Sequence, residues 1–566
     1  MIIYTDFKNS FYKVIQQSQN VVIVSYNDVD ALAATFILTT MCNADEIVYS
    51  LVSVTNWEQL KNVFEEYKQA ATHFILLNCG GFRSLVELDL PSNLCIFVID
   101  SRRPFHLDNV FNEETVRLLC FESEMTELNL PEPSEIFNDE DSDASSDEEE
   151  DEQDENRMAS ATRRVERRMI KQKRIQAWRQ RREEILWKYS NKSYISMPIS
   201  VFLVKIAQSM SKMNAALTWA AAVGLSSYVL DYRISSDNYN SICTERMKEF
   251  LRQHGHGDRN KISSTLKITF ERDLTLPLYR HWTLDDSIRL DPYFICHCRL
   301  WTQKGRDRIK GVYANLGIPL NECTNSFERL DTKRREEVKS ALDARMQCNF
   351  GTFFSHKGFA RWFSAADFAR VISLKLQFSD PDKPHAELFS QALDFFRNFV
   401  EHDGGTSNSM MDALRQYKGA LSSMIQLVYD SCLQKHFIQT PSLIGLTLKQ
   451  QSSEIDYLRS SHCLNIFVYF ALRVFYGMNK TNHRLKKPIF VAVLVSNCQQ
   501  TQIYENYYLV AGEMPLDSFP RLFDELSQDK KLNVVYESIN PNVIRVREDS
   551  YAEFFSRLET RLPAIS

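Results

Sequence analysis

Two aspartates, Asp28 and Asp30, stand one residue apart directly after the apolar run Val21–Tyr26. A later apolar run is followed by Asn78, and the next one by Asp100. Carboxylates that converge from several strands are the hard oxygen ligands with which a two-metal phosphoesterase holds its ions. The spacing therefore places the first ligands of such a centre, or their remnant, at the ends of these runs.

The remaining ligands of such a centre are missing. Asp100 is followed by Ser101, Arg102 and Arg103, and no histidine stands at the predicted strand ends. Three carboxylates cannot balance two divalent ions, and nearby arginines worsen the deficit because like charges repel strongly at low dielectric. We therefore predict that Arg102 or Arg103 takes the place of a metal ion and forms an ion pair with one of the two leading aspartates.

A simpler role is also open to these aspartates. An Asp after a strand often caps the helix that follows, and Asp30 precedes the helix-forming sequence Ala-Leu-Ala-Ala. Spacing alone does not separate a functional origin of the pair from a helix cap.

The elements that would position these residues alternate between strand and helix over the first 121 residues. Helices are expected at Leu32–Met41 and Trp57–Ala70, and short apolar runs predict strands at Val21–Tyr26, Glu46–Val54, His73–Asn78, Cys95–Asp100 and Val116–Phe121. Such alternation predicts an α/β fold with a mostly parallel sheet covered by helices on both faces. Ligands of such sheets bind beyond the carboxyl ends of the strands, where the aspartates lie.

A charged block follows this first region. Residues 139–155 contain twelve Asp or Glu and no basic residue, which predicts a disordered acidic linker over 136–156. Ser142, Ser145 and Ser146 lie inside it and are candidate sites for acidophilic kinases. A purely solubilising tether is the alternative.

The sign of the charge then reverses. Residues 157–182 carry eleven Lys or Arg against one acid and contain neither Gly nor Pro, which predicts a long helix. A stripe on one face would dock it, formed by Ile175, Trp178, Ile185 and Tyr189. Its arginines, among them Arg179 and Arg181, are candidates for nucleic-acid contact, for neutralising the acidic linker or for nuclear import, and a plain solvated face is the alternative.

The rest of the chain divides into a helical middle and an α/β end. Residues 196–480 are mainly helical in pattern, with Thr265–Thr275 and Leu443–Leu448 as possible strands. The C-terminal part predicts strands and helices at Ile489–Ser496, Tyr507–Ala511, Leu516–Leu526, Val534–Glu537, Val543–Val546 and Tyr551–Leu562. The predicted domains are an α/β domain over 1–135, the linker, a basic helix with further N-terminal helices over 157–230, a helical partner-docking insert over 231–385, and helices with a smaller α/β domain over 386–566.

Composition bounds the class of protein. The chain has 566 residues, 44% of them hydrophobic, and a formal net charge of −6, the balance of a globular protein with large cores. Its first residues carry no basic region of a signal peptide, and the apolar stretch Leu217–Leu230 is too short for a membrane span. Twelve cysteines, many inside apolar runs, indicate reduced thiols of the cytosol or nucleus.

The motif residues resemble the DHH phosphoesterase superfamily, which includes the RecJ single-strand exonuclease. Asp28-Val29-Asp30-Ala31-Leu32 resembles its first motif, and Asp100-Ser101-Arg102 occupies its Asp-His-His signature with both histidines replaced. Asn78 stands where the superfamily has an acid, and Ala222-Val223-Gly224-Leu225-Ser226-Ser227-Tyr228 places Tyr228 where it has another metal-binding aspartate. The resemblance implies a vestigial centre with no metal, no cofactor and no catalytic residue.

The whole chain resembles something narrower, the cell division control protein 45 family of eukaryotic replication factors descended from that superfamily. The resemblance rests on signatures in the same order along the chain, which are the acidic block followed by the basic helix, Leu278–Ser287, Leu316–Leu320 and Phe359–Asp367. It implies a DHH-like N-terminal domain and a C-terminal domain of the DHHA1 type that accompanies it.

The resemblance also implies a function. It predicts a nuclear, non-catalytic subunit of the replicative helicase that joins the minichromosome maintenance hexamer and the GINS tetramer, contacts single-stranded DNA and the DNA polymerase machinery, and associates with no membrane. The charge pattern gives two candidate places for nucleic-acid contact, the basic helix and the cleft between the two α/β domains. Lys480, Arg484, Lys486 and Lys487 could line the cleft, although an ordinary exposed loop also explains these four. Two alternatives stay open: a manganese-dependent single-strand exonuclease or phosphodiesterase, and a nuclear adaptor unrelated to replication.

Overall fold

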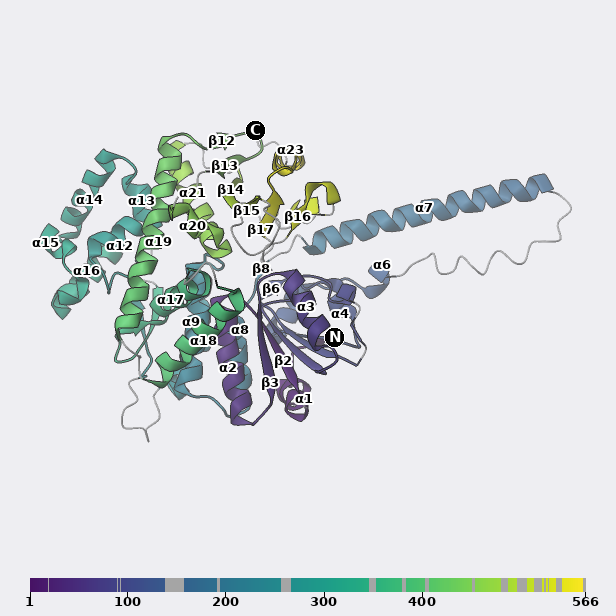
Figure 1. Ribbon diagram of the computed structural model, residues 1–566, viewed down its shortest axis with the longest axis horizontal. Coiled ribbons are helices and arrows are strands. Elements are labelled where there is room, and N and C mark those ends of the chain that lie inside the picture. Colours follow the sequence, from purple (N-terminus) through teal and green to yellow (C-terminus); the bar gives the residue numbers. More distant parts are fainter. Residues whose placement is uncertain are drawn as a thin grey trace.

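Two α/β domains flank a mostly helical middle in the computed structural model (Figure 1). It describes residues 1–18, 20–88, 90–91, 93–137, 157–190, 194–255, 266–345, 353–378, 383–402, 407–449, 453–479, 487–495, 506–513, 522–523, 526–527, 529–535 and 542–562. The acidic block with Ser142, Ser145 and Ser146 therefore lies outside the described residues.

The N-terminal sheet has six parallel strands in the order β1-β7-β5-β4-β2-β3. The strands are β1 (Ile2–Ile3), β2 (Val21–Tyr26), β3 (Tyr49–Val54), β4 (His73–Leu77), β5 (Cys95–Ile99) and β7 (Val116–Leu119). The predicted parallel sheet is confirmed. The short edge strand β1 escaped prediction because two residues give no periodic signal.

Helices cover both faces of this sheet (Figure 1). One face carries α2 (Val29–Ala44), with α8 (Ile199–Ser209) and α9 (Ala215–Leu230) packed against it, and α3 (Trp57–Tyr67) lies across β3 from them. Both α2 and α9 are apolar around their whole circumference, which is the pattern of helices buried on all sides. They form the centre of a core that spans the N-terminal domain and the helical middle.

The long helix α7 (Arg157–Ser190) projects away from the body of the protein (Figure 1). At its C-terminal end Tyr189 is buried in a small core with Leu107 and Ile136, and Leu186 packs against this core. The Tyr189 hydroxyl donates to the Phe105 carbonyl oxygen at 2.8 Å. The predicted docking is confirmed at Tyr189, whereas Ile175, Trp178 and Ile185 are half-buried and their docking stays a prediction.

The middle of the chain adds a small antiparallel sheet to its helices. This sheet has the order β11-β10-β9, with β9 (Thr269–Asp273), β10 (Phe353–Gly358) and β11 (Phe363–Ser364). The helices of this region are α10 (Ser236–Ile242), α11 (Lys248–His254), α12 (Leu284–Leu290), α13 (Pro292–Cys298), α14 (Gln303–Leu316), α15 (Leu320–Thr324), α16 (Thr332–Arg345), α17 (Ala365–Phe378), α18 (His385–Glu401), α19 (Ser407–Leu433), α20 (Ser453–Asp456) and α21 (Ser461–Asn479). The suggested strand near 265–275 is confirmed, whereas β10 was not predicted.

The C-terminal sheet has the order β12-β13-β14-β15-β17-β16. Its strands are β12 (Ile438–Gln439), β13 (Ile444–Leu448), β14 (Ile489–Val495), β15 (Tyr507–Glu513), β16 (Val534–Val535) and β17 (Val543–Arg547), and α23 (Tyr551–Arg561) closes it. Among the strands described in this sheet, β13 and β14 pair in parallel and the other neighbours pair antiparallel. Phe490, Tyr508 and Phe554 belong to a separate small core here, as an independent α/β layer requires.

Within the described residues, no helix is both long enough and apolar enough to span a bilayer.

The contact of α9 with α2 and α8 generates a prediction about Gly224. A Cβ atom there would overlap Ser200 Oγ and come within 2.6 Å of Asp30 Oδ1. We expect Gly224→Ala to lower the free energy of unfolding by about 2 kcal/mol, because overpacking a close helix contact forces the helices apart. The matched control is Gly311→Ala in α14, where a Cβ meets nothing within 4 Å and better helix propensity should add roughly 0.5–1 kcal/mol. Urea denaturation of both variants measures this, and equal effects would contradict the close contact.

A buried histidine in β10 generates a pH prediction. His356 is 1% exposed, and neither ring nitrogen has a hydrogen-bond partner among the described residues. Burial lowers the pKa of His356 from 6.5 to about 4. Because the unfolded chain then binds more protons, stability should fall as the pH drops from 6.5 towards 4, by about 3 kcal/mol in all. We expect His356→Phe to remove most of that loss in denaturation curves at pH 7 and pH 4.5. The exposed His436→Phe is the control and should retain it.

Candidate functional site

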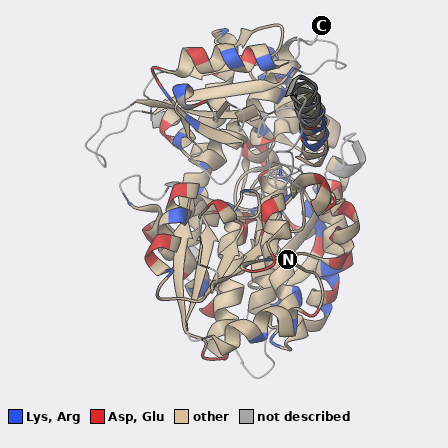
Figure 2. Ribbon diagram, turned by 90° about the vertical axis from the view of Figure 1, so that its right-hand side faces the viewer, with Lys and Arg blue, Asp and Glu red and all other residues tan. Residues whose placement is uncertain are grey.

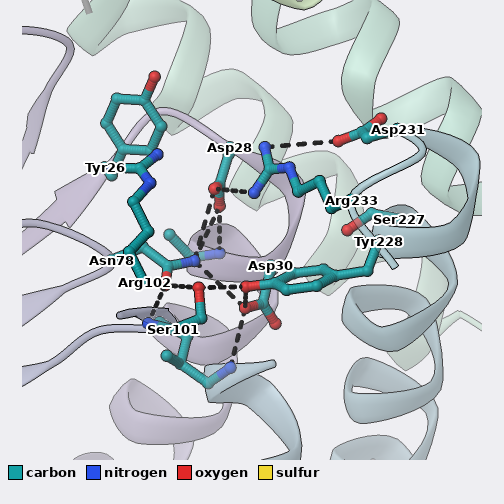
Figure 3. Close-up of polar contacts among 12 residues, drawn as sticks. Tyr26, Asp28, Asp30, Asn78, Ser101, Arg102, Ser227, Tyr228, Asp231 and Arg233 are labelled. Atoms are coloured by element: carbon teal, nitrogen blue, oxygen red, sulfur yellow. Dashed lines mark hydrogen bonds and ion pairs between the residues drawn. The ribbon is translucent and has the colours of Figure 1, made fainter. Parts of the chain in front are cut away.

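The carboxyl ends of β2, β4 and β5 bring the predicted residues together (Figure 3). Asp28 follows β2 and is the N-cap of α2, where its Oδ1 accepts from the Ala31 N–H at 2.7 Å. Asn78 follows β4 with φ of 53°, a left-handed conformation that asparagine tolerates. Ser101 follows β5. The helix cap that the sequence suggested for Asp30 is thus made by Asp28 instead.

Asp30 lies in the first turn of α2 and is fully buried. Its Oδ2 accepts from the Ile199 N–H at 2.9 Å, and its Oδ1 accepts from the Ser200 N–H at 3.1 Å, both at the start of α8. Burial and the nearby Asp28 charge raise the pKa of Asp30, and the hydrogen bonds from α8 partly offset this. The side chain thereby joins the sheet edge to the N-terminus of α8, where the helix dipole favours negative charge.

Three polar side chains complete the surroundings of Asp30. The Tyr228 hydroxyl oxygen lies 2.9 Å from Asp30 Oδ2 and 2.6 Å from Ser101 Oγ. Burial and the Asp30 charge raise the pKa of Tyr228 well above its usual value, so the phenol stays protonated and is a donor. The Asn78 amide nitrogen donates to Asp30 Oδ2 at 3.2 Å, and its carbonyl oxygen accepts from Ser101 Oγ at 3.0 Å. Asn78, Ser101 and Tyr228 are therefore hydrogen-bonded to one another or to Asp30.

An arginine does pair with Asp28, but it is not the predicted one. Arg233 Nη1 lies 3.1 Å from Asp28 Oδ2, and its Nη2 lies 3.4 Å from Asp231 Oδ2. Burial disfavours the guanidinium charge, yet Asp28 and Asp231 hold the pKa of Arg233 above its usual value. Asp231 also lies 3.2 Å from His462 Nδ1 on α21. The polar chain thus runs from the N-terminal sheet to a helix that leads into the C-terminal domain.

The predicted arginines are held elsewhere because the chain after β5 enters a second ladder. β6 (Arg102–Arg103) pairs with β8 (Tyr194–Ile195), and Arg103 is turned to Glu124, with Nε at 3.1 Å from Oε2 in a buried pair. The Arg102 guanidinium lies over the Tyr26 ring at 5.4 Å. The prediction that one of these two arginines pairs with the leading aspartates was therefore wrong in the residue, although correct in the kind of interaction.

Asp100 does not join the two leading aspartates around a common point. Its Oδ2 accepts from the Gly81 N–H at 3.2 Å and its Oδ1 from the Arg102 N–H at 3.0 Å. Both oxygens therefore hold the local turn.

The carboxylate oxygens at this site are not arranged as the ligands of a two-metal centre. Metal ions need carboxylate lone pairs that are directed at a common point. Here Asp30 accepts from two backbone N–H groups, an amide and a phenol, and Asp28 accepts from a backbone N–H and faces a guanidinium. Across the described ranges, no group of three or more His, Cys, Asp or Glu is arranged to hold a metal ion.

The predicted nucleic-acid contacts are only partly within the described residues. Lys480, Arg484 and Lys486 lie outside them. Lys487 is half-buried and its Nζ donates to the Thr440 carbonyl oxygen at 2.9 Å. On α7, Arg179 is exposed, and Arg181 pairs with Glu135 at 3.1 Å. Their roles in binding stay predictions.

Sequence reasoning missed Arg233, Asp231 and His462. Arg233 lies 205 residues from its partner Asp28, and no local pattern encodes so distant a contact. The sequence offers one weak signal: Arg233 stands three residues after the apolar stretch that ends at Leu230, with Asp231 between them.

Comparison with known proteins assigns the chain to a family. The model of the CDC45 family matches residues 21–162 and 138–561. The human cell division control protein 45 homolog is 27% identical over 583 aligned residues, which cover 98% of this chain and 99% of the human protein. The crystal structure of CDC45 from Entamoeba histolytica is 16% identical and covers 99% of each chain with a TM-score of 0.70, so the fold is shared. A weaker likeness, with a TM-score of 0.43 and 11% identity, is to an exonuclease RecJ structure bound to manganese, covering 98% of this chain and 93% of that one.

The ion pair at Asp28 generates a stability prediction. Asp28→Ala removes the partner of a mostly buried Arg233 and also the cap of α2, and we expect a loss of about 3 kcal/mol in the free energy of unfolding. Asp28→Asn keeps a capping side chain and should lose about 1 kcal/mol less than Asp28→Ala. Thermal and urea denaturation of both variants measure the difference. Unchanged melting temperatures in both would show that the pair contributes nothing.

Proposed function

This chain belongs to the CDC45 family, and from that premise we propose that it is a non-catalytic subunit of the eukaryotic replicative DNA helicase. Family membership supports a role as a replication factor. Within that role, we propose that the protein joins the minichromosome maintenance hexamer and the GINS tetramer, acts in the nucleus, and contacts single-stranded DNA and the polymerase machinery. The match along nearly the whole chain supports this, because a shared catalytic motif alone would leave the helical middle unmatched.

The observation that carries the non-catalytic part is the set of partners around Asp28 and Asp30. A phosphoesterase of the DHH type needs its carboxylate oxygens for metal ions that activate water. In this chain an arginine, a tyrosine, an asparagine and backbone N–H groups of α8 use those oxygens. A positive guanidinium beside Asp28 also repels a second cation at short range. The same residues instead stabilise the junction between the sheet and the helices around it.

The charge distribution supports local rather than bulk contact with nucleic acid. The net charge is −6, and Lys, Arg, Asp and Glu are interspersed over the view in Figure 2. A protein that binds duplex DNA through bulk electrostatics presents a continuous basic surface. Binding of a single strand needs only a short groove with aromatic and basic groups.

The enzymatic alternative is tested with purified full-length protein, a labelled single-stranded oligonucleotide and Mn²⁺. We expect no degradation by the wild-type chain above that of buffer. Degradation that disappears in the Asp28→Ala variant would establish the manganese-dependent nuclease and end the non-catalytic proposal. Degradation that persists in the variant would indicate a contaminating nuclease.

Membership of the helicase is tested by copurification. We expect the tagged chain, isolated from replicating cells of its own organism, to bring down minichromosome maintenance and GINS subunits in stoichiometric amounts. Their absence under conditions in which those subunits copurify with each other would favour an adaptor unrelated to replication.

A further inference from the structure

A cavity of about 740 Å³ lies beside the polar centre around Asp28 and Asp30. The end of α9, the segment around Asp291, and helices α17, α19 and α21 enclose it, and Arg233 lines it while also holding Asp28. The volume falls within the range of ordinary small-ligand pockets, roughly 300–1,000 Å³. Aromatic and charged side chains share its lining, among them Tyr232, Asp291, Tyr469 and Arg473.

Flat side chains are stacked at this cavity. The rings of Tyr232 and Tyr469 lie 3.6 Å apart at 16°, and the Arg473 guanidinium lies 4.3 Å from the Tyr469 ring centre. Two groups this close cannot share one face of a ring, so Tyr469 is held between Tyr232 and Arg473. Tyr232 lies at the other end of the stack and is 40% exposed as a whole, while burial of its hydroxyl end, together with the neighbouring Tyr469 and Asp291, raises the pKa of Tyr232 well above its usual value. A further planar group that enters the cavity would extend the stack on Tyr232.

The backbone of Tyr232 is strained in the conformation that places this ring. Its φ is +56°, in the left-handed region that a bulky residue rarely adopts. This conformation belongs to the way α9 ends: the Arg233 N–H donates to the Tyr228 carbonyl oxygen at 2.8 Å, and Tyr232 is the left-handed residue between them. Glycine is the residue most often found at such a position, so the helix ending itself does not require a ring there.

A polar group stands near the stack. Asp291 is buried, and its Oδ1 caps α13 by accepting from the N–H groups of Tyr293 at 2.9 Å and Phe294 at 3.4 Å. The carboxyl group also lines the cavity, near the Arg473 charge. Burial raises the pKa of Asp291 to about 6, so near neutral pH it is mainly an acceptor. A carboxylate that accepts from the exocyclic amine of a base is a common form of base recognition.

We infer that this cavity binds a nucleobase of a single-stranded nucleic acid, stacked on the Tyr232 ring with its polar edge towards Asp291. The inference rests on the proposed single-strand contact and assigns that contact to a place. Stacking on aromatic side chains is how proteins bind single strands without strong sequence preference, and it requires few phosphate contacts, in keeping with the acidic net charge.

The test uses purified full-length chain and fluorescence anisotropy with a fluorescein-labelled single strand of mixed sequence, about 20 nucleotides long. Tyr232→Gly removes the ring and also relieves the left-handed strain, so the melting temperature should stay nearly unchanged. The affinity of Tyr232→Gly for the labelled strand should fall about tenfold, which is the loss expected when one base no longer stacks on an aromatic ring. Tyr232→Trp keeps a stacking ring and should bind like wild type. Tyr4→Ala is the matched control, because Tyr4 is also 40% exposed and lies outside the cavity.

Competition separates the two sources of a base. Displacement of the labelled strand by deoxycytidine monophosphate would show that a free nucleotide is enough for binding. Displacement by unlabelled strand but not by the nucleotide would show that neighbouring nucleotides are needed. Both outcomes support a base-binding site in the cavity. Equal binding by wild type and Tyr232→Gly would overturn the inference and leave the proposed single-strand contact to another surface. If the wild-type chain binds neither strand nor nucleotide, the inference and the proposed DNA contact both fail, while copurification still decides helicase membership.

Discussion

The fold depends on two carboxylates that cannot leave the interior. Asp28 and Asp30 stand side by side at the end of a buried strand, and burying adjacent negative charges is costly unless each is paired and hydrogen-bonded. The chain meets this demand from distant segments: Asn78 from a neighbouring strand end, the backbone of α8, Tyr228 from α9 and Arg233 just beyond it. Ser101, from the next strand end, holds Asn78 and Tyr228 in place. Satisfying the pair therefore fixes how α8 and α9 approach the sheet.

The tight packing of these helices follows from the same demand. Two backbone N–H groups at the start of α8 reach Asp30 only if that helix begins close to the sheet edge. Gly224 lets the α9 backbone approach Ser200 and Asp30 at the same point, and Tyr228, one turn further along α9, then reaches over the carboxylate. The N–H groups of α8, Gly224 and the Tyr228 hydroxyl therefore depend on one another. Removing any of the hydrogen-bond donors would leave an oxygen of the buried Asp30 carboxylate unsatisfied.

Much of this was predictable from the sequence, and the failures share a cause. The N-terminal strands have strong apolar runs with helices between them, so their common carboxyl edge could be predicted, and with it the meeting of Asp28, Asp30, Asn78 and Ser101. Tyr228 lies on a helix, and only the family resemblance placed it at this site. The arginine partner could not be predicted. Arg102 and Arg103 are nearest in the chain, but the β6–β8 ladder and Glu124 determine where they point, and those contacts depend on the folded structure. Propensity and pattern describe elements, whereas the choice among several arginines is made by tertiary contacts that span hundreds of residues.

Arg233 carries the polar network beyond the carboxyl edge of the N-terminal sheet. Its second nitrogen faces Asp231, and Asp231 faces His462 on α21. The next turns of α21 carry Tyr469 and Arg473, and Arg233 itself lines the cavity where they stack with Tyr232. Burial lowers the pKa of His462, so near neutral pH the chain of contacts ends on a mostly neutral ring and Asp231 is left to balance Arg233. The ion pairs of Arg233 thus connect the N-terminal sheet to the helix that forms one wall of the cavity. Arg233 belongs to the polar centre around Asp28 and to the lining of the cavity at the same time.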